Sequence, residues 1–254
     1  MLRALPACLL AALALASPAH AETYRLRYEA AVLGVVVLGE IRYEIAATPT
    51  RYAARGAVRT SGLARLFDQT EITASATGAI SGAAIAWTRY DLSHAYASKF
   101  RRVQLSRSAS GVSAEVSPAF GSLGEPPATP AQQTGSYDPL TALFALGRQI
   151  GAARACTGAV LVFDGRQHYR LSVAPRGQET FSGGGYEGQA LRCAFRYQPI
   201  AGFSLSAAES ASIPAAEALF ALPGRSGFAP PLRLVVPTPL GPAQLDLREY
   251  EEVG

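Results

Sequence analysis

Apolar and polar residues alternate along most of this chain after residue 21. Near the start of that stretch, Tyr24, Leu26 and Tyr28 alternate with Arg25 and Arg27. A period of two places successive side chains on opposite faces of a β-strand, so each such segment predicts a strand with one buried and one wet face. On this pattern, and on short apolar runs bounded by glycine and serine clusters, we predict strands at residues 24–29, 41–45, 52–59, 69–76, 85–90, 100–107, 111–116, 160–163, 168–173, 191–197, 232–236 and 243–248.

Residues 33–38 depart from this alternation because they are apolar at both parities. The segment reads Leu-Gly-Val-Val-Val-Leu and is the most hydrophobic stretch after residue 21. An exposed apolar patch of that length is an aggregation hazard, so something must cover it. We therefore expect one face of the segment to meet the core and the other to meet a ligand, a helix or a partner.

One helix is predicted among the strands. Residues 121–135 are rich in proline and glycine and are typical of a long surface loop. Asp138 is a suitable N-cap, and Pro139 at the first helical position loses no needed hydrogen-bond donor. We expect a helix near residues 138–150 that buttresses the sheet. Gly151 can take the left-handed conformation that ends such a helix. The apolar stripe of the helix consists of Leu140, Leu143, Phe144, Gly147 and Ile150.

These elements together predict a mainly β fold. We expect a single antiparallel curved sheet, or a partly open β-barrel, with the one buttressing helix. Residues 22–254 are predicted to form one β-barrel-like domain, since a chain of that length can bury about 70% of its unfolded surface in one core.

The first 21 residues have the pattern of a secretory signal peptide. Arg3 gives a positive start, residues 9–16 are an unbroken apolar run, and Ala19-His20-Ala21 fits an Ala-x-Ala cleavage site. The run is shorter than the about 20 residues that a bilayer-spanning helix needs. We expect cleavage near Ala21 and an exported protein that is not an integral membrane protein.

The charge and the cysteines of the chain argue against nucleic-acid binding and against a redox-active cysteine pair. The net charge is +4, and it falls to +3 when Arg3 leaves with the signal peptide. The bases are spread along the strands, which does not favour a nucleic-acid surface. Cys156 and Cys193 are the two cysteines after residue 21 and lack the close spacing of a redox pair. In an exported chain they most simply form one disulfide.

Several residues in the second half resemble a known family. The chain is similar to the exported proteins of Gram-negative bacteria called domain of unknown function 3108 (DUF3108), which implies a periplasmic location. The resemblance implies that the two cysteines are the family's bridge and that the Asp-Gly-Arg segment is a structural hairpin. The residues that carry it are Tyr137-Asp138-Pro139, Cys156, residues 162–166 with Tyr169, Gly188, Cys193 and residues 199–202.

Known catalytic and metal-binding patterns are not found in the sequence. His94 and His168 are the two histidines after residue 21, and they lack the spacing of a metal site. Asp164 and His168 could be drawn as an orienting acid and a base, but a hairpin turn already explains the aspartate. We therefore expect no metal, no cofactor and no enzymatic activity.

The favoured hypothesis is a non-enzymatic periplasmic β-barrel protein that contributes to cell-envelope integrity. It would bind a hydrophobic, lipid-like ligand in its interior, or dock other envelope proteins. The candidate lining residues are Tyr24, Tyr28, Val36 and Tyr43, on the inward parity of the first strands or in the doubly apolar segment. The alternative is a hydrolase or transferase that acts on envelope polymers through an unrecognised active site.

Overall fold

The computed structural model describes residues 21–66, 69–204, 206–222 and 227–253. The predicted signal peptide, up to residue 20, lies outside the described residues.

Thirteen strands form one antiparallel sheet, in the order β7-β6-β5-β4-β3-β2-β1-β13-β12-β11-β10-β9-β8. Strands that follow one another in the sequence pair with each other, except β7 and β8, which form the two edges, and β1 pairs in addition with β13. The strands are β1 (Glu22–Val32), β2 (Val36–Ala47), β3 (Arg51–Thr60), β4 (Thr70–Ser81), β5 (Ala84–Tyr96), β6 (Lys99–Ser108), β7 (Gly111–Ser117), β8 (Gly158–Phe163), β9 (His168–Gly183), β10 (Tyr186–Ala201), β11 (Ala216–Ala221), β12 (Pro231–Val236) and β13 (Ala243–Val253).

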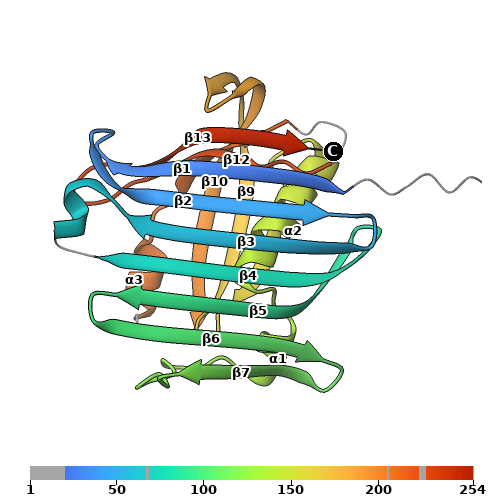
Figure 1. Cartoon of the computed structure of the whole chain (residues 1–254), viewed down its shortest axis with the longest axis vertical. Coiled ribbons are helices and arrows are strands. Elements are labelled where there is room, and N and C mark those ends of the chain that lie inside the picture. The colour runs from blue at the N-terminus through green and yellow to red at the C-terminus, as the bar shows by residue number, and fades with distance from the viewer. Residues whose placement is uncertain (1–20, 67–68, 205, 223–226, 254) are drawn as a thin grey trace, which may run out of the picture.

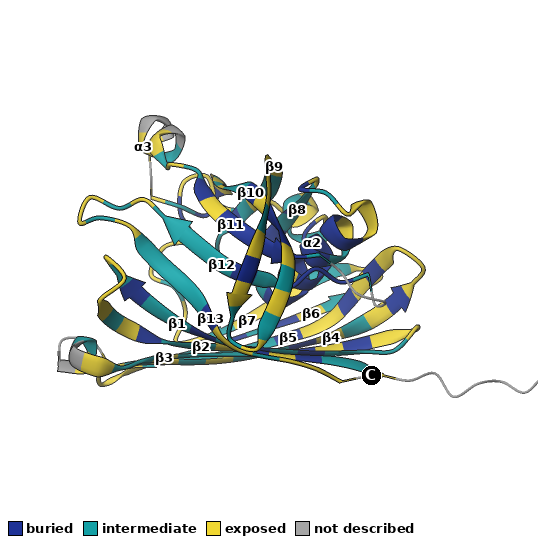
Figure 2. Cartoon of the chain, turned by 90° about the horizontal axis from the view of Figure 1, so that it is seen from above, coloured by how far each residue is buried: buried dark blue, intermediate teal, exposed yellow. Residues whose placement is uncertain are grey.

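The sheet curls into a partly open barrel around a helix. Strands β1–β7 form a front layer, and β9 and β10 cross behind it at a steep angle (Figure 1). Seen from above, α2 (Pro139–Ala153) lies with the back strands on the concave side of the front layer (Figure 2). The two edge strands, β7 and β8, do not pair with each other. This arrangement confirms the predicted mainly β, partly open fold.

The edge of β8 is covered by the segment that leads into α2. Tyr137 forms a parallel bridge with Val162: its N–H donates to the Leu161 carbonyl (2.9 Å), and its own carbonyl accepts from the Phe163 N–H (2.8 Å). An open row of strand hydrogen-bonding groups is prone to pair with other chains. The segment before α2 therefore protects one open edge of the sheet.

Helix α2 begins as its sequence predicts. Asp138 is the N-cap, and its Oδ1 accepts hydrogen bonds from the N–H groups of Leu140 and Thr141, both at 3.0 Å. Pro139 occupies the first helical position. Phe144 and Ile150 are buried, whereas Leu143 is 39% exposed. Residues on several sides of α2 are buried, so the helix fills one part of the barrel as well as supporting its wall.

The end of α2 differs from the prediction. The helix runs to Ala153, and Arg154 takes the left-handed conformation with φ 49° instead of Gly151. Gly151 serves packing: a Cβ there would lie 1.9 Å from the Gly227 carbonyl oxygen, and one at Gly147 would lie 2.4 Å from the Phe228 ring. The two glycines, one turn apart, let residues 227–229 cross directly over the helix.

The predicted strands are present, with corrections at four places. Strands β9 and β10 are much longer than expected, and β11 was missed because its residues are buried at nearly every position and do not alternate. The loop at residues 121–135 contains a short helix, α1 (Pro130–Thr134), which a Thr129 capping box starts. The Asp164-Gly165 turn joins β8 to β9 through residues 164–167, so it is longer than a two-residue hairpin. Two further short elements, η1 (Gly62–Leu66) and α3 (Ala207–Ser212), lie in connections.

Residues 33–38 are not covered as expected. The chain turns at residues 33–35, with φ values of 56° at Leu33 and 71° at Gly34, so the first half of the segment is a hairpin turn, and residues 36–38 form the start of β2. Leu33 is 57% exposed and Val35 is 78% exposed. The expectation failed because it treated a turn as a continuous strand.

The predicted disulfide is present. Cys156 and Cys193 are bonded, with their Cα atoms 5.5 Å apart. Both residues are buried, and the bond ties the chain just after α2 to β10.

Removal of the Phe144 ring tests whether α2 is a packed plug. Phe144 lies 5.2 Å from the Tyr52 ring and 5.6 Å from the Phe228 ring, centroid to centroid. Phe144→Ala should lower the free energy of unfolding by about 3–5 kcal/mol, measured by urea denaturation. The half-exposed Leu143→Ala is the matched control and should cost less than half as much. A loss below about half a kcal/mol for Phe144→Ala would contradict the plug.

Loss of the disulfide should also destabilise the fold. The cysteines are 37 positions apart, and the chain-entropy model gives about 4 kcal/mol for a loop of that size. A Cys156→Ser, Cys193→Ser double variant should therefore unfold at lower urea concentration and lower temperature. Alkylation of the wild type without reductant should label neither cysteine, and labelling of both would contradict the bond.

Candidate functional site

An apolar cavity of about 290 Å³ lies between α2 and the concave face of the sheet. Strands on both sides of the barrel contribute to its wall, and α2 closes one side. Leu143, the half-exposed residue of the helix stripe, lies in this wall. Other apolar lining residues are Ile41, Val58, Ile72, Leu92, Leu140, Leu146, Phe195, Phe220, Leu234 and Leu245.

Two of the three tyrosines of the described wall, which are Tyr28, Tyr43 and Tyr90, donate their hydroxyl groups to backbone carbonyls. Tyr28 donates to the Pro231 carbonyl (2.7 Å), and Tyr43 donates to the Leu140 carbonyl (3.2 Å). Burial raises the pKa of both phenols, so both stay neutral. Since the hydroxyls already have partners, the two residues offer their rings to the cavity.

An open groove adjoins the cavity. This groove, about 650 Å³, shares Ile41 and Val58 with the cavity and is also lined by Val36 and Leu38. In the β1–β2 pair, Ala30 lies opposite Gly39 but Ala31 lies opposite Val37. Leu38 is thus the extra residue of a one-residue bulge in β2. The bulge reverses the face onto which the β2 residues before it point, which accounts for Val36 and Leu38 lining the groove.

A buried polar network holds the start of α2 beside the cavity. The second carboxylate oxygen of Asp138 accepts a hydrogen bond from the Thr141 hydroxyl, which lies 2.6 Å from the Tyr52 hydroxyl. Burial raises the pKa of Asp138 to about 6, against the hydrogen bonds from Thr141 and Leu140 that lower it. The network therefore fixes the helix and, through it, one wall of the cavity.

The structure places the four candidate lining residues in three different surroundings. Tyr28 and Tyr43 lie in the cavity wall, and Val36 lies in the adjoining groove. The Tyr24 ring instead packs on Phe228 at 5.1 Å, and its hydroxyl donates to Glu252 at 2.8 Å.

Sequence reasoning missed the contributions of the second half of the chain to the cavity. Phe195 lies in the strand predicted at residues 191–197, on the same parity as the apolar Leu191 and Cys193, which was a usable signal. Phe220 lies in the unpredicted β11, and Leu143 was treated simply as part of a packed stripe.

Asp164 and His168 are not arranged as an acid and a base. Asp164 Oδ1 accepts from the N–H groups of Arg166 (2.9 Å) and Gln167 (2.7 Å), as an aspartate does in a turn. Neither ring nitrogen of His168 has a hydrogen-bond partner among the described residues, and the side chain is 3% exposed. Burial lowers the pKa of His168, so the imidazole is neutral at pH 7.

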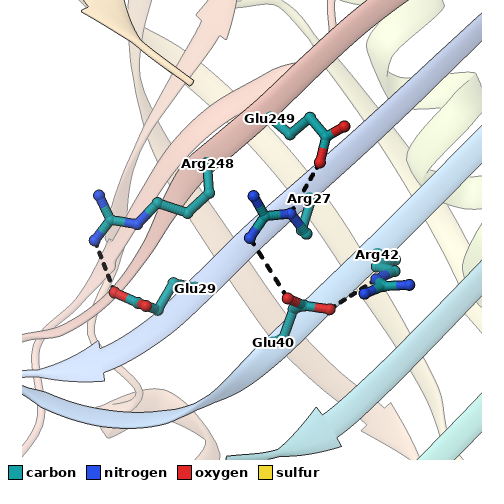
Figure 3. Close-up of polar contacts among 6 residues, drawn as sticks. All are labelled: Arg27, Glu29, Glu40, Arg42, Arg248 and Glu249. Atoms are coloured by element: carbon teal, nitrogen blue, oxygen red, sulfur yellow. Dashed lines mark hydrogen bonds and ion pairs between the residues drawn. The ribbon is translucent and has the colours of Figure 1, made fainter. Parts of the chain in front are cut away.

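The outer face of the sheet carries a network of ion pairs between neighbouring strands (Figure 3). These pairs are exposed, and each contributes little to stability. Their main effect is to neutralise the arginines of this face. The pairs drawn are Arg27–Glu249 (2.9 Å), Arg27–Glu40 (3.5 Å), Arg42–Glu40 (2.7 Å) and Arg248–Glu29 (2.7 Å).

Clusters of metal ligands and bilayer-spanning helices are both absent from the part of the chain that the structure describes. Within it, no three histidine, cysteine, aspartate or glutamate side chains are grouped as a metal site would require. The helices in the same residues are all too short or too polar to cross a bilayer.

The comparison with protein families decides the relationship of the chain. The model described as "Protein of unknown function (DUF3108)" matches residues 23–209. The chain belongs to the DUF3108 family. No curated protein matches it.

A solved structure shares the fold of this DUF3108 protein. It is the crystal structure of a β-barrel-like protein of domain of unknown function DUF1849 from Brucella abortus, with 11% sequence identity and a TM-score of 0.54. The match covers 91% of this chain and 98% of the other. The similarity therefore extends over most of the chain.

The pH dependence of stability tests the burial of Asp138. Because its pKa rises from 3.8 to about 6, protonation stabilises the fold: this contribution is complete below about pH 4 and is lost as the pH rises through about 6. Asp138→Asn stays neutral throughout. The stability of the wild type relative to this variant should therefore fall by about 3 kcal/mol between about pH 4 and pH 7.5, measured by urea denaturation.

Asp91 provides a control of opposite sign. The hydrogen bond from Arg89 lowers the pKa of this partly buried carboxyl, so its contribution is present above its unfolded pKa and is lost as the pH falls. An advantage of wild type over Asp138→Asn that grows with rising pH would contradict the raised pKa.

Proposed function

We propose that this DUF3108 protein is a non-enzymatic periplasmic β-barrel that binds one hydrophobic, lipid-like molecule and thereby contributes to cell-envelope integrity. The observation that carries the proposal is the apolar cavity beside α2, with its continuation to the open end of the barrel.

The chemistry of the wall favours an apolar ligand. The tyrosine hydroxyls of Tyr28 and Tyr43 are already bonded to backbone carbonyls. The charged residues of the described lining are Arg42 and Arg233, and each has a carboxylate partner at 2.7 or 2.6 Å. A ligand would gain affinity mainly by removing its apolar surface from water.

The size of the cavity fits a slender ligand. Ligand pockets commonly measure about 300–1,000 Å³, and this cavity lies at the lower end of that range. The groove beyond Ile41 and Val58 adds length toward the open end. A single acyl chain in the cavity, with its polar end in the groove, satisfies both the shape and the polarity.

The location rests on the signal peptide pattern and the disulfide. Disulfides persist in oxidising compartments such as the bacterial periplasm. An activity on envelope polymers is the alternative, and it would need reactive polar groups that open onto a cleft. Of the pair that sequence reasoning considered for such a role, Asp164 is held in a turn and His168 is buried.

Filling of the cavity should abolish ligand binding. Ala74 lines the cavity from β4, and Ala74→Phe should weaken the binding of a fluorescent fatty acid by about tenfold or more, because its ring occupies the ligand's space. Ala53→Phe, on the exposed face of β3, is the matched control and should bind like the wild type. Titration of the probe measures both, and circular dichroism checks folding.

Mass spectrometry of organic extracts of the protein, purified from the cells that make it, should also detect a co-purified lipid. Equal affinity of the wild type and a folded Ala74→Phe variant would contradict the cavity as the binding site.

A further inference from the structure

An exposed apolar tip lies at the open end of the barrel. It consists of five side chains: Leu33 (57% exposed), Val35 (78%), Val36 (46%), Leu38 (38%) and Leu240 (81%). The β1–β2 and β12–β13 turns bring these residues together, since the Leu33 N–H donates to the Pro242 carbonyl (2.9 Å) and the Leu33 side chain contacts Gly241. In Figure 1 the β1–β2 turn is on the left, at the end of the sheet away from α2.

The tip carries no charge. Residues 30–39 and 234–245 contain no acidic or basic residue. The nearest carboxylates on these strands are already paired: Glu29 with Arg248, Glu40 with Arg42, and Asp246 with Arg233. A neutral aliphatic surface matches the acyl region of a lipid layer and gives no charge complementarity to a protein partner.

The size of the tip also favours a lipid surface over a protein partner as its occupant. Five partly exposed aliphatic side chains present a few hundred Å², about the size of the largest patch on an ordinary monomer. A stable protein–protein interface buries about 800 Å² on each partner and is enriched in aromatic residues and arginine. The tip is smaller than that and has neither residue type.

The tip is continuous with the candidate ligand path. Val36 and Leu38 belong both to the tip and to the groove that shares Ile41 and Val58 with the cavity. A surface that covers the tip therefore also covers the mouth of the groove. If that surface is a bilayer, an acyl chain passes between lipid and cavity without crossing water, whose contact with apolar surface is unfavourable.

We propose that the tip docks on a phospholipid bilayer and inserts its aliphatic side chains among the lipids. The choice of a bilayer rests on the proposed function, because a bilayer that contacts the tip can also donate the lipid-like ligand to the cavity or accept it. The insertion is hydrophobic, so it does not depend on anionic lipids.

Vesicle flotation tests the proposal, with the full protein and vesicles of uncharged phosphatidylcholine. The wild type should float with the vesicles. Val35→Asp and Leu240→Asp should each reduce the bound fraction by about tenfold or more, because each places a charge among acyl chains. Both positions are largely exposed, so the melting temperature should stay at the wild-type value.

Val253→Asp is the matched control. Val253 is 48% exposed and lies opposite Thr23, at the other end of the β1–β13 pair from the tip. This variant should float like the wild type. All variants share the same N-terminus, so a difference between them arises from the substituted position. Addition of phosphatidylglycerol to the vesicles should change wild-type binding by less than about twofold.

The outcomes separate this proposal from the cavity proposal. Failure of the wild type to float, or equal flotation of the wild type and both tip variants, would overturn the docking site even if the fatty acid probe still binds in the cavity. Flotation that depends on the tip supports docking even if the probe does not bind. A concentration-dependent dimer that Val35→Asp dissociates, without flotation of the wild type, would assign the tip to a second copy of the chain.

Discussion

The burial of α2 on the concave side of an open sheet is the constraint on which the cavity depends. The first turn of a helix has N–H groups without helical partners, and water cannot serve them in a buried position. Asp138 accepts hydrogen bonds from two of these groups and, at its other oxygen, from the Thr141 hydroxyl, which also bonds the Tyr52 hydroxyl. The carboxylate is costly to bury, which its raised pKa shows, but its replacement by an apolar residue would leave the N–H groups unpaired.

The other end of α2 is held by backbone proximity. Gly147 and Gly151 have no side chains, so residues 227–229 lie directly against the helix, and the Ala229 N–H donates to the Gly147 carbonyl at 3.0 Å. The helix is thus held by a polar cap at its start and by a crossing segment in its later turns. The space that it does not fill, on the side of Leu143, is the cavity. Position and size of the site are therefore consequences of how the helix is held.

The sequence predicted the parts of the fold in which local chemistry and tertiary packing agree. Alternating strands such as β1 have one wet face, and Asp138-Pro139 is a helix start that the backbone itself requires. β11 was not predicted because a strand that is buried on both faces does not alternate between apolar and polar residues. The role of Gly151 escaped because a packing glycine and a terminating glycine look the same in a sequence.

Only the part of the candidate site that comes from the N-terminal half of the chain was predictable from the sequence. Tyr28 and Tyr43 share the inward face that alternation defines, whereas Phe220 reaches the cavity through pairings between strands far apart in sequence. The turn at residues 33–35 illustrates the same limit. Its hydrophobicity is plain from the sequence. Whether its side chains are buried or exposed depends on the neighbouring β12–β13 turn, which is far away in the sequence and contains Leu240.

The order of the strands has a consequence for how the chain assembles. Eleven of the twelve strand pairings join strands that are consecutive in the sequence and can form as soon as the second strand has been made, but β1 gains its second partner only when β13, at the far end of the chain, arrives. Until then the hydrogen-bonding edge of β1, with the apolar turn beside it, is an open template for other chains. The pairing that joins the two halves is also the one with the largest loop to close, so its entropic cost of closure is the highest. A chain that is threaded from its N-terminus must therefore keep its first strand from aggregation for the whole time that its last strand takes to emerge.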